Sequence, residues 1–398
     1  MRSAFRRFWI GQTASQLGEH SCLVILPLIA VISLDVGGAQ LGALRAAGQV
    51  PVLLVSLLAG AGMDRWRART VLVTTDLIRA AALIAVAVAA LTGTLGLPML
   101  AVAAFTVGTM SVFFDVAYHV YLVRLLPRDR LPGGTSAVEG SRSAAQIGGP
   151  ALGGTLVSLL SPPVAVLSGA VFFTLSALAI GGIPWREPAP PPTARGRIRD
   201  GIRFVARNPV LRTVALASAA FQFFLAGLMT AYLTFLTREL HLDGTAVGLS
   251  LAAAGPGALL GSLLAARFGY GVVLVTAAAA GDGVMLFLPV VHGPPAVTVP
   301  LLMTINFLFG TFGQLVNVTA TVVRQSVTPA GLQGRVAATI TFAGLGPAPL
   351  GSVLGGLSAD HHGLRLTLLG TAAGMLLSPI LMARSPLGRW TDVRGQDT

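Results

Sequence analysis

Long apolar runs constrain the fold of this chain more than any other feature. The chain is 54% hydrophobic and 11% charged, whereas soluble proteins carry about 25% charged residues. A helix needs roughly 20 apolar residues to cross a bilayer. Runs of this kind lie near 8–33, 41–62, 71–92, 98–123, 135–158, 163–184, 211–236, 246–268, 272–291, 297–323, 338–358 and 364–384. The sequence therefore predicts an all-α integral membrane protein with twelve transmembrane helices.

The positions of the basic residues predict the orientation. All 27 basic residues are arginine, and most fall on the connecting segments that share a side with the N-terminus. The opposite side holds Arg45, Arg238 and Arg365. Since cytoplasmic loops are rich in Lys and Arg, we expect a multi-pass protein of the cell membrane with both termini in the cytoplasm. A nucleic-acid partner is not expected, because that would need basic residues clustered on a soluble face.

No pattern of catalytic or metal-binding residues is recognisable. The single cysteine, Cys22, lies inside an apolar run, which excludes internal disulfides and cysteine metal clusters. The glycine-rich stretch at 255–261 lies inside a predicted span and lacks the P-loop lysine. We expect no metal, no cofactor and no enzyme activity.

The longest polar stretch, at 186–209, predicts the domain organisation. It contains a proline run, which favours an extended spacer, followed by alternating basic and apolar residues that favour a short surface helix. We expect a six-helix half at 1–184, a cytoplasmic linker at 185–210, a second six-helix half at 211–384 and a tail at 385–398. Two such halves around a central cavity are the architecture of many secondary transporters.

A charged loop joins the second and third spans. Its residues match the pattern G-x-x-x-D-R-x-G-R-R at Gly60, Asp64, Arg65 and Arg69. The loop thereby resembles the signature of the major facilitator superfamily, although Arg67 and Ala68 depart from the pattern. The resemblance implies a conformational latch. The aspartate would cap a helix of the other half, and the arginines would bind acidic groups and membrane lipids. An ordinary basic loop is the alternative.

Asp76 and Arg79 follow this loop and lie within the third span. We predict that they belong to the conformational latch. Their i, i+3 spacing allows them to pair on one helix face. The stretches 64–80, 111–154, 201–212 and 332–338 resemble exporters related to the enterobactin exporter and the macrolide-efflux proteins. This resemblance covers most of the chain and implies a transporter rather than a soluble protein.

A glycine motif lies in the fifth span. Its residues fit G-P-x-x-G-G, a motif that the superfamily associates with proton antiporters that export; they are Gly149, Pro150, Gly153 and Gly154. A glycine face for close helix packing, without bearing on transport direction, is the alternative.

Carboxylates inside the spans are candidates for proton coupling. Glu19 lies roughly 16 Å into the first span at about 1.5 Å per residue, and burial favours the protonated form of a carboxylate. The resemblance also places an acidic residue at this point. Asp115 and Asp282 are further candidates. Structural roles are the alternatives: an arginine-paired or permanently protonated Glu19, and an Asp115 that pairs with Arg79 or Arg142.

Polar and aromatic residues of the spans are candidates for a substrate cavity, or for contacts between helices. They are Gln49, Tyr118, Gln146, Gln222, Phe223, Tyr232, Asn306, Gln314 and Asn317. We expect a monomeric, proton-driven exporter of a small amphipathic compound such as a drug, a natural product or a siderophore. Uptake of a metabolite, lipid translocation and a non-transporting membrane receptor are the alternatives.

Overall fold

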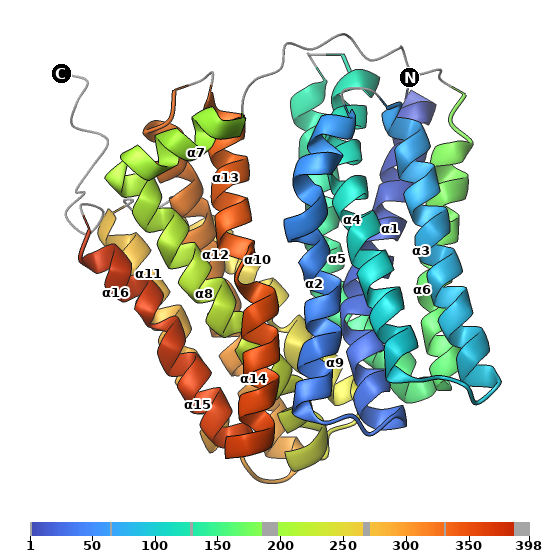
Figure 1. Cartoon of the computed structure of the whole chain (residues 1–398), viewed down its shortest axis with the longest axis vertical. Helices are drawn as coiled ribbons and strands as arrows, with labels where there is room; N and C mark the ends of the chain where they lie inside the picture. Colours follow the sequence, from blue (N-terminus) through green and yellow to red (C-terminus); the bar gives the residue numbers. More distant parts are fainter. Residues whose placement is uncertain are drawn as a thin grey trace. The chain divides into compact units, whose positions relative to one another are not determined.

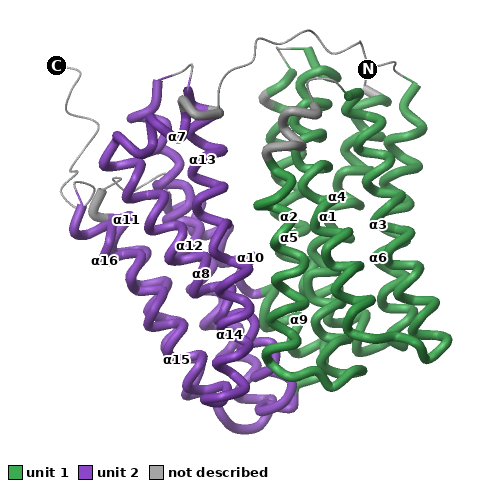
Figure 2. The backbone as a smooth tube through the Cα atoms, viewed as in Figure 1, with its two compact units in different colours: residues 1–194, 242–252 green, residues 195–241, 253–398 purple. Residues whose placement is uncertain are grey.

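The computed structural model describes residues 2–63, 66–127, 130–184, 198–265, 271–329 and 332–385. Within these ranges the chain forms helices and connecting segments and no strand. The chain forms two compact units, which are shown in two colours in Figure 2. Unit 1 comprises residues 1–194 and 242–252, and unit 2 comprises residues 195–241 and 253–398. The predicted boundaries of the two halves stay a prediction.

Unit 1 is a bundle of long helices (Figure 1). Its elements are α1 (Arg2–Ser33), α2 (Gly38–Met63), α3 (Ala68–Leu91), α4 (Leu97–Leu125), α5 (Leu131–Leu159), α6 (Pro162–Gly181) and the short α9 (Gly244–Ala252). Helix α1 packs against α5 and α6, α2 packs against α4, and α3 packs against α4 and α6. These contacts bring α1, α3, α4 and α6 together around the candidate site.

Unit 2 holds the remaining helices. They are α7 (Ile198–Arg207), α8 (Pro209–Thr234), the π-helical turn η1 (Phe235–Glu239), α10 (Ala254–Ala265), α11 (Gly271–Val284), the 3-10 segment η2 (Met285–Val290), α12 (Pro295–Ser326), α13 (Gln333–Leu345), α14 (Ala348–His362), α15 (Leu364–Met375) and α16 (Leu377–Ala383). The short helix predicted for the linker is confirmed as α7. Helix α8 begins at Pro209 because Asn208 caps it: Asn208 Oδ1 accepts hydrogen bonds from the amides of Val210 and Leu211, at 3.0 and 3.2 Å.

The helices coincide with the predicted spans. Ten helical segments of the described part are long and apolar enough to cross a membrane. The long helices α2 and α5, of 26 and 29 residues, match the predicted second and fifth spans. Large apolar side chains such as Leu91, Leu178 and Leu263 are 69%, 68% and 69% exposed, which suits contact with hydrocarbon.

Several spans are interrupted, a feature that hydropathy does not reveal. The eighth span divides into α9 and α10, the eleventh into α13 and α14, and the twelfth into α15 and α16, while the ninth changes from α11 to 3-10 geometry. Prolines accompany these changes, at Pro256, Pro289, Pro347 and Pro379. Proline lacks the N–H of the helix ladder and clashes with the preceding turn, which favours a break at these four positions. Proline does not always break a helix here, since Pro27, Pro51, Pro150 and Pro300 lie inside continuous helices.

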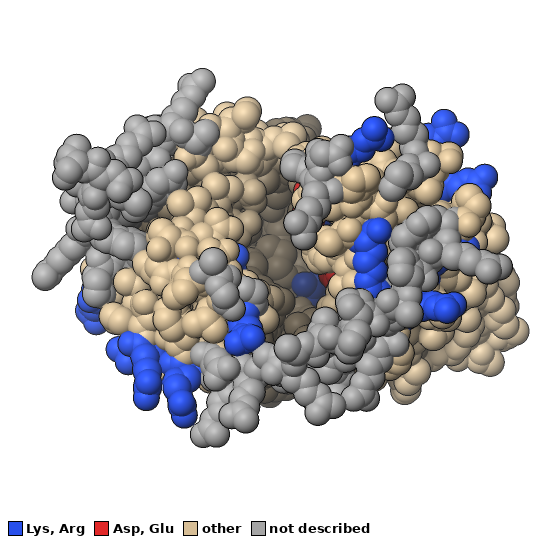
Figure 3. Space-filling view, turned by 90° about the horizontal axis from the view of Figure 1, so that it is seen from above, with Lys and Arg blue, Asp and Glu red and all other residues tan. Residues whose placement is uncertain are grey.

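Figure 3 shows one face of the molecule on which arginine side chains are prominent and acidic side chains are few. Such an accumulation of arginine on one face is what the positive-inside prediction requires. The orientation of the termini stays a prediction.

The glycines of the predicted export motif lie at close helix contacts in unit 1. A Cβ added to Gly149 would lie 2.5 Å from the Cβ of His20, and one added to Gly153 would lie 2.7 Å from the carbonyl oxygen of Ser21. Gly154 meets the backbone of α9 in the same way, and Pro150 lies inside α5. The motif therefore has a packing role, and its link to export stays a prediction.

Replacing Gly153 by valine should destabilise unit 1, because the new side chain overlaps the backbone of α1. We expect a loss of about 1–3 kcal/mol in the free energy of unfolding, measured by thermal or denaturant unfolding in detergent. Gly148→Val is the matched control, since a Cβ at Gly148 meets no atom within 4 Å. Equal stability of the two variants would contradict the packing role.

Candidate functional site

A guanidinium group without exposed surface lies inside unit 1. Arg79, on α3, is 0% exposed. Its Nη2 donates to Oδ1 of Asp76 at 2.5 Å and to Oγ of Ser15 at 2.9 Å, and its Nη1 donates to Oγ of Ser111 at 3.2 Å. Ser15 Oγ in turn donates to Asp76 Oδ1 at 3.0 Å. The predicted pairing of Asp76 with Arg79 is confirmed.

Glu19, on α1, is the second carboxylate beside this guanidinium. Its Oε2 lies 3.5 Å from Arg79 Nη1, and its side chain is 20% exposed. The rings of Phe114 and Phe173 lie 4.6 and 4.3 Å from the Arg79 Cζ atom, where the ring faces attract a cation. We call Ser15, Glu19, Asp76, Arg79 and Ser111 the Arg79 cluster. With both carboxylates ionised the cluster carries one excess negative charge, and a proton on Glu19 makes it neutral.

The Arg79 cluster adjoins a cavity of about 210 Å³, which we call the unit 1 cavity. Its polar wall comes from α1, α2 and α4 and consists of Glu19, Arg45, Gln49, Ser111 and Asp115. The structure thus brings three predicted residues together, namely Glu19, Gln49 and Asp115. The lone cysteine, Cys22, also lines this cavity.

Arg45 is a wall residue that the sequence prediction assigned to a connecting segment. That assignment is wrong, because Arg45 lies within α2 and faces the same cavity as Glu19. Its position inside the apolar run 41–62 was the available signal, since a charge within a span is a functional candidate.

Asp115 connects the unit 1 cavity to a second set of polar residues, namely Tyr118, Glu139 and Arg142. Its Oδ2 lies 3.9 Å from Nη2 of Arg142. Arg142 Nη1 donates to Oη of Tyr118 at 2.8 Å, and Tyr118 Oη donates to Oε1 of Glu139 at 3.2 Å. This chain of contacts joins α4 to α5. Tyr118, a predicted residue of the substrate cavity, is completely buried and lies in the middle of this chain of contacts.

The predicted latch is described only in part. Gly60 is a residue of α2, and Asp64 and Arg65 lie outside the described residues. Arg69 Nη2 donates to the carbonyl oxygen of Gly181, which ties the start of α3 to the end of α6. The latch function of these residues stays a prediction.

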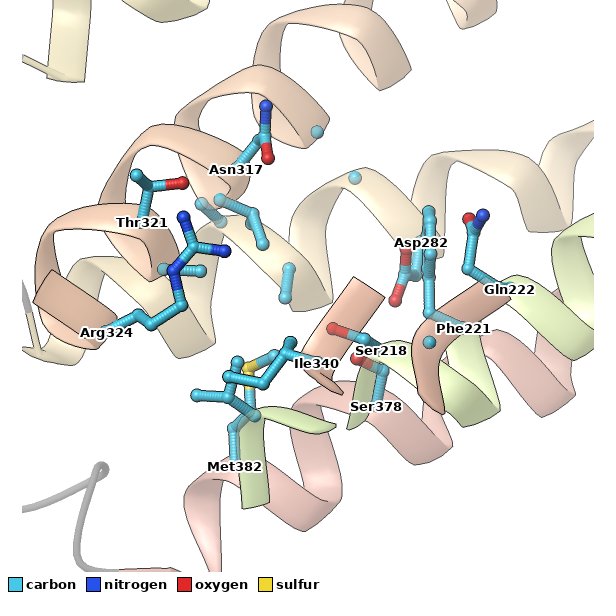
Figure 4. A pocket seen from close by; sticks show the side chains of 18 of the residues that line it. Ser218, Phe221, Gln222, Asp282, Asn317, Thr321, Arg324, Ile340, Ser378 and Met382 are labelled. Atoms are coloured by element: carbon cyan, nitrogen blue, oxygen red, sulfur yellow. The ribbon is translucent and has the colours of Figure 1, made fainter. Parts of the chain in front are cut away.

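Unit 2 has a cavity of its own, the unit 2 pocket, with a volume of about 400 Å³. It is lined by α8, α11, α12, α13 and α16 (Figure 4). Three predicted residues line it, namely Gln222, Asp282 and Asn317. In the described part of the chain, no group of three or more His, Cys, Asp or Glu residues is placed to hold a metal ion.

The remaining substrate candidates lie elsewhere. Asn306 Nδ2 donates to Oη of Tyr232 at 2.8 Å, and both residues are buried, so they form a contact between α12 and α8. Gln146 is exposed on α5, and Phe223 and Gln314 are half-buried on α8 and α12. Their part in substrate binding stays a prediction.

The sequence comparison decides the family. A family model described as "Transmembrane secretion effector", of the major facilitator type, matches residues 1–396. The chain belongs to this family of the major facilitator superfamily. The predicted membership is thereby confirmed.

Two curated relatives and one solved structure illustrate the relationship. The multidrug efflux pump Tap of Mycolicibacterium fortuitum is 29% identical over 376 residues, and the alignment covers 87% of each chain. Tap of Mycobacterium tuberculosis H37Rv is 26% identical over 403 residues, covering 95% of this chain and 92% of the relative. The crystal structure of the nucleoside transporter NupG superposes with a TM-score of 0.79 at 13% identity, covering 98% of this chain and 100% of NupG.

The NupG superposition shows the twelve-helix fold of the superfamily and nothing of the substrate. Together with the family membership, it makes this chain a multi-pass transporter of the cell membrane. Members of the family are transporters and not enzymes. The Arg79 cluster and the unit 1 cavity are therefore candidate parts of a transport mechanism.

Removing the charge of Arg79 should strongly destabilise this transporter. Arg79→Gln leaves the Asp76 carboxylate buried without its cation, and we expect a loss of about 3–5 kcal/mol in the free energy of unfolding. Unfolding in detergent, followed by circular dichroism, measures the change. The double variant Asp76→Asn/Arg79→Gln removes both charges and should recover part of the loss. A single variant as stable as the wild type would show that the pair contributes little.

Proposed function

We propose that this transporter exports a small amphipathic compound in exchange for protons. Relatives of similar length are described as multidrug efflux pumps. The observation that carries the proton step is the position of Glu19, which lines the unit 1 cavity and lies 3.5 Å from the buried Arg79. In this proposal protons reach the Glu19 carboxylate through the cavity. The contact with Arg79 couples the charge of Glu19 to the helices that surround the guanidinium.

The charge balance of the Arg79 cluster suggests how coupling works. Ionised Glu19 and Asp76 together exceed the single charge of Arg79, and a proton on Glu19 removes the excess. A substrate that places positive charge or hydrogen-bond donors in the unit 1 cavity would stabilise ionised Glu19 and so compete with the proton. Asp115 and Arg142, 3.9 Å apart, are the proposed continuation of this path.

The unit 1 cavity also favours an amphipathic ligand. Apolar side chains, including Leu23, Leu26 and Val52, line it beside the charged wall. Its volume of about 210 Å³ is below the roughly 300–1,000 Å³ of pockets that enclose drug-sized ligands. It would therefore hold one polar part of such a molecule.

The proposal includes the predicted topology. With both termini in the cytoplasm, the potential supplies about 2.3 kcal/mol per inward charge per 100 mV. The halves 1–184 and 211–384 would alternate access around the substrate, and the loop with Asp64 and Arg65 would open and close with them. Membrane lipids would bind the arginine-rich side, and the transporter would act as a monomer.

The proposed proton site is tested with purified protein in proteoliposomes. Wild type should accumulate ethidium, an amphipathic aromatic cation, when a pH gradient is imposed. Glu19→Gln should lose this gradient-driven accumulation and keep ethidium exchange at zero gradient, because the amide cannot carry the proton. Glu239→Gln is the control, since Glu239 pairs with Arg365 at 2.8 Å in unit 2.

The other outcomes separate the alternatives. A gradient response that persists in Glu19→Gln would contradict the role of Glu19 and move the proton site to Asp115 or Asp282, the other predicted candidates. A wild type that equilibrates ethidium without responding to any gradient would contradict proton coupling and favour a facilitator. No transport in either direction would favour a membrane receptor.

A further inference from the structure

The proposed proton exchange leaves the unit 2 pocket without a role. At about 400 Å³, this pocket falls within the roughly 300–1,000 Å³ of typical ligand sites. All of its lining residues belong to unit 2, and neither Glu19 nor Asp115 is among them. Any ligand of this pocket therefore binds separately from the carboxylates of the unit 1 cavity.

Asp282 gives the pocket a carboxyl group for which the described residues supply no ion-pair partner. Its side chain is 3% exposed, and its buried Oδ2 accepts no hydrogen bond from the part of the chain that the structure describes. Figure 4 shows the carboxylate beside Gln222 and facing the pocket. A buried charge of this kind is costly unless a partner compensates it, so the carboxylate favours a cationic ligand.

Aromatic and apolar groups form the wall next to this carboxylate. The rings of Phe221 and Phe309 stack with centroids 6.3 Å apart and an interplanar angle of 18°, and both residues line the pocket. Val214, Ile340 and Met382 extend the apolar wall. Such a surface suits an alkyl chain or a flat ring system, and the ring faces attract an ammonium group.

The other end of the pocket carries the opposite charge. Arg324 lines it together with Asn317 and Thr321, and Figure 4 shows the three side chains on the side away from Asp282. Gly313 and Arg324 both line the pocket and are separated by roughly 16 Å along α12, at about 1.5 Å per residue. The pocket is therefore elongated. The Arg324 guanidinium repels a second positive charge and attracts acceptor oxygens. A bound molecule would therefore place its cationic end near Asp282 and its oxygen-bearing end near Arg324.

We propose that the unit 2 pocket binds an elongated amphipathic molecule with a single ammonium group, which pairs with Asp282. The apolar body of the ligand lies along the aromatic wall, and its acceptor oxygens face Arg324. Binding of this ligand requires neither proton exchange nor the residues of the unit 1 cavity.

The probe for this site is dansylcadaverine, which joins one primary ammonium group through an alkyl chain to an aromatic sulfonamide. Its fluorescence increases in apolar surroundings, so binding can be titrated without transport. The titration uses the full-length protein in phosphatidylcholine nanodiscs, with empty nanodiscs as the blank. Wild type should bind the probe saturably. The N-acetylated probe, which has no charge, should bind about tenfold more weakly or worse, because a charged hydrogen bond is lost.

Two pairs of variants locate the site. Asp282→Asn keeps the shape of the side chain and should weaken dansylcadaverine binding about tenfold or more. Glu239→Gln should leave binding unchanged, because Glu239 pairs with Arg365 and lines neither cavity. Gly313→Leu should abolish binding by filling the pocket, because a Cβ at Gly313 meets no atom within 4 Å. Gly370→Leu is the matched control, since Gly370 is exposed on α15, is equally open and lies outside the pocket.

The same titrations contain the outcomes that overturn the proposal. It fails if wild type shows no saturable binding, or if the charged and the acetylated probes bind equally. It also fails if folded Asp282→Asn or Gly313→Leu protein, with an unchanged melting temperature, binds as wild type does. Loss of binding in Glu19→Gln, titrated in the same way, would place the probe in the unit 1 cavity instead. A defect of Glu19→Gln in gradient-driven transport alone concerns the proton exchange and leaves this site intact.

Discussion

Hydrocarbon offers no hydrogen-bond partners, so a polar group that this chain places within the membrane is costly unless the protein satisfies it. Long helices satisfy the backbone. Arg79 needs more, because its guanidinium has no exposed surface. Hydroxyl and carboxylate oxygens from α1, α3 and α4 and rings from α4 and α6 supply its contacts. The packing of four helices in unit 1 thus depends on one buried cation.

The two units differ in the cation that accompanies a buried carboxylate. Asp76 and Asp282 each have a buried Oδ2 without a hydrogen bond from the described residues. Oδ1 of Asp76 is bound by Arg79 and by a serine hydroxyl, so its charge is compensated within unit 1, whereas Asp282 in unit 2 adjoins a pocket. Between these extremes lies Glu19, which contacts Arg79 and also meets a cavity. A group in this intermediate position is suited to exchange its partner, whereas Asp76 is suited to hold the structure.

The spans and the pairing of Asp76 with Arg79 are predictable from the sequence, because length, apolarity and an i, i+3 spacing are local properties. The interruptions of the later spans are not, since hydropathy does not register a change of helix geometry. The cavity position of Arg45 is not predictable either, because its neighbours in the unit 1 cavity come from α1 and α4. Which helix faces share a cavity depends on tertiary packing, and one sequence contains no direct signal for it.

The lone thiol of Cys22 has a practical consequence. It lines the cavity that also holds Glu19 and Asp115, and the sequence contains no other cysteine. A thiol-reactive reagent that modifies the unaltered protein therefore labels one known wall position and no background site. Because Cys22 is only 3% exposed, its rate of modification in the wild-type chain would report how often a reagent reaches this interior, without the cysteine-free parent that such experiments ordinarily require.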